Sequence, residues 1–330
     1  MKKMLLGMFG SVIGILLLTQ NAFALTVSPV KLETIGDPGK TITGEIILLN
    51  EEDKEITYYS SFERFDAEGE SGNPVFSKVT EGLPTWITIR DSVTLGPHER
   101  LTVPYTVEIP NDAAPGGNFA AIFWNTVPPD ELNTGEVALG AKVGILMLLR
   151  ISGDILEGGN LLEFGIKHNQ TFFTAPPVDF WYRFKNTGID RVKPSGTVTI
   201  RNTFGLKTTE FNANPTDGNV LPDSIRRLTT YWNEKDSQGS EIKYPEELSF
   251  ASQVKYELTH FHLGRFTAKL HLEYGTDGKT TDAKVSFWMI PWHALILIIS
   301  ALFVALVLGI IFITRYNRWI IKRAHAKTQV

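Results

Sequence analysis

The chain contains no cysteine among its 330 residues. A protein without thiols has no disulfide framework, no thiolate metal site and no cysteine nucleophile, so each folded part depends on the burial of its core. Both ends also lack acidic residues: all 36 Asp and Glu lie within residues 25–289, together with 25 of the 32 Lys and Arg. This net acidic segment is unsuited to a phosphate backbone, and we expect no nucleic-acid partner.

The central segment also lacks the clearest signatures of catalysis. It has no Gly-x-Ser-x-Gly elbow, the sharp turn that exposes the nucleophile of many hydrolases. Neighbouring acids such as Glu246 and Glu247 have no spacing that nominates one as acid and the other as base. We therefore predict a protein that is not an enzyme and needs no cofactor, and keep a cell-wall hydrolase as the alternative.

The N-terminus has the pattern of a secretory signal peptide over residues 1–24. Lys2 and Lys3 precede an apolar stretch, and the small residues Ala22 and Ala24 end it. A basic start, an apolar middle and a small-x-small end are typical of a cleaved leader. An uncleaved anchor is the alternative.

A second apolar stretch near the C-terminus predicts a transmembrane helix over residues 290–314. The run Ala294–Ile313 has no charge, and 20 residues at about 1.5 Å each span roughly 30 Å, the thickness of one hydrocarbon core. Aromatic residues flank it as an interfacial belt would, namely Trp288, Trp292, Tyr316 and Trp319. A buried helix of a soluble protein is the weaker interpretation.

The tail, residues 315–330, is basic and too short to fold by itself. Its five bases are Arg315, Arg318, Lys322, Arg323 and Lys327. By the positive-inside rule these bases place the C-terminus in the cytoplasm, where they also contact lipid headgroups. We therefore predict a single-pass cell-membrane protein with residues 25–289 outside the cytoplasm.

Between the two ends, apolar residues alternate with polar ones. One example is Val178, Phe180, Tyr182 and Phe184; similar runs begin at Leu101 and at Phe266. Period-two alternation between frequent Gly, Pro and Asn turns is typical of half-buried antiparallel strands. The sequence predicts two immunoglobulin-like β-sandwiches, residues 25–152 and 153–288, and no long helix outside the membrane.

Exposed aromatic and loop residues are the candidates for ligand contact. Trp124 and Trp181 are large amphipathic side chains, and Asn118 follows the turn Gly116-Gly117 at a predicted sandwich end. The alternative for both tryptophans is packing in an interdomain groove. Three histidines are weak candidates for a zinc or copper site, because His260 and His262 would share one face of a strand and His271 would lie across from them.

Turns and strand ends give the chain a resemblance to a known family. In the first domain they are Thr26–Val30, Gly36–Gly39, Leu48–Glu52, Leu95–Pro97, Ile109–Asp112 and Gly116–Gly117. In the second they are Phe184–Gly188, Pro194–Gly196 and Val220–Pro222. With the leader, the span and the basic tail, they resemble the WxL-interacting cell-surface proteins over nearly the whole chain.

That resemblance implies a first domain that binds peptidoglycan and a second that binds a partner protein. We therefore expect a membrane-anchored bacterial surface protein whose partners are membrane lipid, peptidoglycan or another envelope polymer, and another surface protein. Periplasmic pilus chaperones are similar at some of the same first-domain positions, although soluble chaperones have no membrane span. An envelope assembly factor that pairs strand edges with its partners is accordingly the alternative function.

Overall fold

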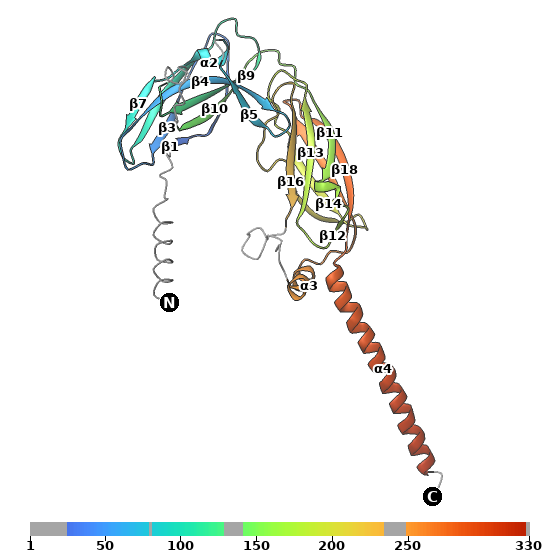
Figure 1. Cartoon of the computed structure of the whole chain (residues 1–330). Helices are drawn as coiled ribbons and strands as arrows, with labels where there is room; N and C mark the ends of the chain where they lie inside the picture. Colours follow the sequence, from blue (N-terminus) through green and yellow to red (C-terminus); the bar gives the residue numbers. More distant parts are fainter. Residues whose placement is uncertain (1–24, 79–80, 129–140, 234–248, 328–330) are drawn as a thin grey trace, which may run out of the picture. The chain divides into compact units, whose positions relative to one another are not determined.

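The computed structural model describes residues 25–78, 81–128, 141–233 and 249–327 (Figure 1). The predicted signal peptide lies outside the described residues. The chain divides into two compact units, residues 1–68 with 73–156 and residues 69–72 with 157–330. Each unit is a mainly antiparallel β-sandwich of immunoglobulin type, and the second also carries the C-terminal helix.

The first sandwich consists of two sheets. One sheet has the order β1 (Leu25–Ser28), β3 (Thr41–Asn50), β8 (Arg100–Glu108) and β6 (Ile87–Thr88). The other has the order β2 (Lys31–Gly36), β10 (Lys142–Ile151), β9 (Gly116–Asn125), β4 (Ile56–Glu68) and β5 (Asn73–Ser77), with β7 (Ser92–Leu95) also on β4. A one-turn helix, α2 (Leu83–Trp86), precedes β6. All pairs are antiparallel except β2 with β10, which is parallel.

The second sandwich also has two sheets. One has the order β11 (Gly159–Ile166), β13 (Val178–Asn186) and β16 (Ile225–Trp232). The other has the order β12 (Phe172–Phe173), β18 (Lys279–Met289), β17 (Gly264–Tyr274), β14 (Ser195–Arg201) and β15 (Lys207–Asn212). Three helices complete this unit: the short η2 (Lys167–Asn169), α3 (Phe250–Thr259) and α4 (Trp292–Lys327).

The alternation in the sequence corresponds to the inward faces of these sheets. Val178, Phe180, Tyr182 and Phe184 are all buried, and the inward residues of β8 and β17 are buried in the same way. Burial of alternate side chains between two facing sheets is the main stabilising contribution in a sandwich without disulfides. The predicted immunoglobulin-like β-sandwiches with a C-terminal apolar helix are confirmed.

Each sandwich contains a buried asparagine at a strand end that ties loops to the core. Asn50 donates from Nδ2 to the carbonyl oxygens of Lys54 and Gly96, both at 2.8 Å, and its Oδ1 accepts from the Tyr58 hydroxyl at 3.1 Å. Asn186 does the same in the second unit, donating to the carbonyls of Asp190 and Val220 at 2.7 and 2.9 Å. Both side chains are fully buried, so each bond replaces one to water.

We expect Asn50→Ala to lower the free energy of unfolding by about 3 kcal/mol, because it leaves buried carbonyls and a hydroxyl without partners. Asn160→Ala is the matched control: its side chain is exposed on β11, and a change of under about 0.5 kcal/mol is expected. Urea unfolding of the detergent-solubilised full chain measures both. Equal stabilities for the two variants would contradict this role of Asn50.

Candidate partner-binding site

The first half of β10 is paired on one side only. β9 pairs with β10 along all of Lys142–Ile151, whereas β2 pairs with Leu146–Ile151 alone. Among the residues that the structure describes, no strand pairs with Lys142–Ile145 on the side where β2 lies. Within the described ranges this segment, which we call the free end of β10, is an unpaired sheet edge.

The direction of the backbone groups follows from two printed bonds. The N–H of Leu146 donates to the Val30 carbonyl beside β2, and the N–H of Thr126 donates to the Ala141 carbonyl beside β9. Since successive residues of a strand point their N–H and C=O groups to opposite sides, Lys142 and Gly144 face away from β9. Two N–H and two C=O groups therefore lie along the free end, at the spacing that an added strand uses.

The chain leaves this edge at Pro29. β1 belongs to one sheet and β2 to the other, and Pro29 and Val30 connect them. Before Pro29 the chain belongs to β1, which pairs with β3, so the pairing with β10 does not continue in the direction of Lys142. Val30, the last residue bonded to β10, is 71% exposed.

The outer face beside the free end carries aromatic rings and one cation. The Lys142 Nζ lies 2.7 Å from the Glu63 Oε1 and 3.7 Å from the centroid of the Phe123 ring. Phe123 meets Phe76 edge to face at 4.9 Å between centroids. Gly144 leaves room for this ring, because a Cβ at that position would lie 2.6 Å from it. The inner face is apolar: Ile145 is fully buried and Val143 packs against the core.

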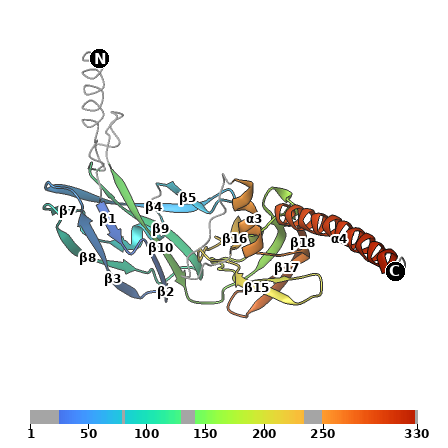
Figure 2. The ribbon, with the colours of Figure 1, turned by 90° about the horizontal axis from the view of Figure 1, so that it is seen from below.

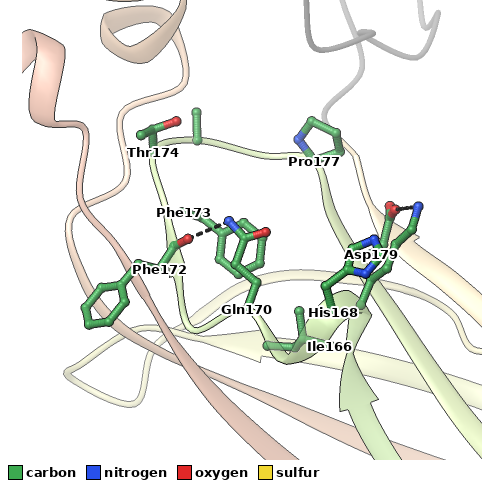
Figure 3. Close-up of a pocket in the computed structure, with 10 residues that line it drawn as sticks. Ile166, His168, Gln170, Phe172, Phe173, Thr174, Pro177 and Asp179 are labelled. Atoms are coloured by element: carbon green, nitrogen blue, oxygen red, sulfur yellow. Dashed lines mark hydrogen bonds and ion pairs between the residues drawn. The ribbon is translucent and has the colours of Figure 1, made fainter. Parts of the chain in front are cut away.

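The second unit has a cavity of about 430 Å³ between η2 and β13 (Figure 3). Ile166, Phe173, Ala175 and Pro177 supply apolar lining. Three of the polar side chains are paired: Lys167 Nζ lies 3.1 Å from Asp179 Oδ2, and Gln170 Nε2 donates to the Phe172 carbonyl at 2.7 Å; His168 and Thr174 complete the polar lining. This lining is suited to holding an apolar group.

The three residues predicted to contact a ligand lie in strands and not in loops: Asn118 and Trp124 in β9, and Trp181 in β13. Trp124 is fully buried in the first core, so the expectation that it is exposed is wrong. Asn118 lies inside β9, opposite Leu149, and not in the preceding loop. Trp181 is 9% exposed: its Nε1 donates to the Ile166 carbonyl at 3.2 Å, and the Arg227 guanidinium lies 4.0 Å from its ring. Trp124 is buried because its position in β9 points its side chain into the core, and the residue type alone does not indicate that direction.

The three histidines do not form one strand face. His260 ends α3, with its Nδ1 3.0 Å from the Tyr256 carbonyl, and His262 follows in the turn before β17. His271 lies on β17 and contacts Asp282 at 3.0 Å. Over the described part of the chain, no group of three or more His, Cys, Asp or Glu residues could hold a metal ion. Because α3 ends at His260 and β17 begins only at Gly264, His260 and His262 do not lie on a strand and do not share a strand face.

The C-terminal helix is long and apolar enough to cross a membrane over Trp292–Ile320, with a mean hydropathy of 3.3 over its most apolar 18 residues. The helix begins at Trp292 and continues to Lys327, beyond the segment predicted to cross. Trp288, Trp292, Tyr316 and Trp319 are each between 44% and 51% exposed, as residues of an interfacial belt need to be. The five tail bases all lie within this helix.

Comparisons with known proteins give no relative. No family model and no curated protein matches the chain. Among solved structures, the class 5 fimbriae chaperone CfaA is 8% identical with a TM-score of 0.37, covering 81% of this chain and 100% of its own. The E. coli chaperone DraB is 11% identical with a TM-score of 0.35 and coverages of 81% and 97%. A PapD-like domain of human CEP192 is 15% identical with a TM-score of 0.26, covering 42% of this chain and 94% of its own.

We predict that the rate of amide hydrogen exchange falls sharply along β10 between the free end and the part paired with β2. In the unbound full chain we expect the amides of Lys142 and Gly144 to exchange at least about tenfold faster than that of Leu146, since local opening is easiest where backbone groups face solvent. Exchange read by mass spectrometry with fragmentation to single residues measures this ratio. Slow exchange at Gly144 would show that the edge is covered.

Proposed function

We propose that the ectodomain of this membrane-anchored chain binds an extended segment of a partner protein, which adds as a strand to the free end of β10. The observation that carries the proposal is the incomplete cover of β10: β2 occupies six of its ten positions. An open, irregularly terminated edge of this kind is the structure that β-strand addition uses. We propose a chaperone-like role, in which the bound segment belongs to another envelope protein.

Magnitudes indicate which contacts would supply the affinity. Four main-chain hydrogen bonds, from Lys142 and Gly144, contribute roughly 1 kcal/mol each in net terms. That sum of about 4 kcal/mol corresponds to millimolar binding at best. The partner segment must therefore also bury side chains.

The two faces of the free end indicate which side chains of the partner segment would fit. On the inner face, an apolar side chain of the partner would lie beside Val143 and Ile145 and close the edge of the core. On the outer face, the next side chain would meet the Lys142 side chain, which lies over the buried Phe123 ring. An aromatic residue suits this face, because its ring can contact the Lys142 cation. The favoured segment alternates aliphatic and aromatic residues.

The membrane helix suits this function. With the tail bases in the cytoplasm, α4 would hold the ectodomain at the non-cytoplasmic face of the cell membrane. A translocated partner chain first emerges at that face. Binding of peptidoglycan or another envelope polymer stays a prediction. Its expected aromatic contacts have little free surface, because Trp124 is buried and Arg227 covers the ring of Trp181.

The proposal predicts that Lys142→Pro abolishes partner binding while Lys142→Ala weakens it about threefold to tenfold. Both variants lose the contact with Glu63, but only proline removes an outward N–H. A photocrosslinking residue at Val143 in the full chain, expressed in its own membrane, captures the partner, and mass spectrometry locates the linked residue.

The same photocrosslinking residue at Asp277, in the exposed turn between β17 and β18, is the control. Crosslinks confined to one extended segment, lost in Lys142→Pro and retained in Lys142→Ala, are expected. Equal crosslinking in both variants, or crosslinks scattered over a folded partner surface, would contradict the proposal that the partner binds by strand addition. Crosslinking to glycan strands would instead favour the polymer.

A further inference from the structure

Large apolar side chains are exposed at the end of the second sandwich where α4 begins. Phe204 is 84% exposed, Leu206 64%, Phe172 59% and Leu263 53%, and Leu258 and Phe261 are nearly half exposed. We call these six residues the membrane-proximal rim. Isolated exposed apolar side chains are common, but a group gathered at one end marks an interaction surface.

Strand register brings four separate segments to this end. β17 begins at Gly264, opposite Met289, the last residue of β18, and α4 begins at Trp292. Phe172 pairs with Trp288 in the same sheet. The turn between β14 and β15, which carries Phe204 and Leu206, is bonded to the start of β17: the Thr203 hydroxyl accepts from the Arg265 N–H and donates to its carbonyl, both at 3.0 Å.

A buried carboxylate fixes α3 to the first turn of α4. Glu257 is 1% exposed; its Oε2 accepts the Ala294 N–H at 2.8 Å, and its Oε1 lies 2.5 Å from the Nδ1 of His293. Figures 1 and 2 both show α3 beside the start of α4. The carboxylate satisfies an N–H that the helix end leaves without a partner. Leu258 and Phe261 are therefore held at the level of Ala294.

The level of Ala294 in a membrane follows from the length of the apolar run. Arg315 ends the run at one side, and roughly 20 residues at 1.5 Å each reach back across a 30 Å hydrocarbon core to the first turn of α4. The headgroup region of the same leaflet then lies around Trp292, α3 and the rim. Exposed basic side chains accompany the rim at Lys255 and Arg265, where they suit lipid phosphates.

We propose that the membrane-proximal rim docks into the headgroup region of the leaflet that α4 enters, so that the second sandwich rests on the lipid surface. The argument for lipid as the occupant is continuity: the rim adjoins the membrane-spanning helix, and α3, which carries Leu258, is bonded to that helix through Glu257. Aromatic and leucine side chains next to basic residues are the composition of interfacial membrane contacts. This inference depends on α4 spanning a bilayer and is independent of binding at β10.

The absence of cysteine makes a direct test practical, since one introduced thiol labels a single site. Full chains carrying F204C, L258C or F261C are labelled with a nitroxide and placed in nanodiscs of phosphatidylcholine and phosphatidylglycerol. Asp277→Cys is the matched control, because Asp277 lies in an exposed turn at the opposite end of the strand pair β17 and β18. Collision rates with oxygen, which enters lipid, and with a water-soluble nickel chelate are measured at each site.

At the three rim sites we expect an oxygen-to-nickel collision ratio at least about threefold above that at position 277, as for residues in a membrane interface. A ratio equal to that of the control places the rim in water and overturns the proposal. Low collision rates with both reagents mean that protein, either a second copy or another partner, covers the rim, which also overturns it. If L258C misfolds by near-ultraviolet circular dichroism, F204C on its separate turn decides the outcome.

Discussion

Both sandwiches depend on one constraint: with no covalent crosslink, two facing sheets must bury their inward side chains completely. Ile46, Leu48 and Ile122 in the first unit and Val198, Leu270 and Leu272 in the second are buried for this reason. Burial also requires partners for the backbone groups at the strand ends. Asn50 and Asn186 donate hydrogen bonds to groups that would otherwise lie unpaired in the core. Loops are thus tied to the sheets without disulfides.

Because backbone groups and apolar side chains need partners, the free end of β10 indicates what kind of molecule could bind there. β2 continues beside β10 only until the chain passes through Pro29 to the other sheet, and from there Lys142–Ile145 keeps its outward backbone groups. Closing the edge needs backbone donors and acceptors together with an apolar side chain beside Val143. A segment of another protein supplies both, which is why the geometry favours a protein partner over a polymer without a peptide backbone.

In the second unit, a buried carboxylate connects the sandwich end to the apolar helix α4. Glu257 joins α3 to α4 through the Ala294 N–H, so the sandwich and the membrane helix share a fixed junction. The rim that surrounds this junction has the composition of a lipid contact. An ectodomain that rests on the bilayer holds its orientation, whereas one attached by a free hinge does not.

The sequence by itself determined the C-terminal apolar helix and the class of fold, because a 20-residue apolar run and period-two alternation are local patterns. Only the tertiary structure decided which strand covers which edge, that Trp124 is buried, and that His260 ends a helix. Alternation assigns a side chain to one face of a strand but not to a covered or an open sheet edge. That depends on pairing between residues far apart in the chain, as β2 and β10 illustrate.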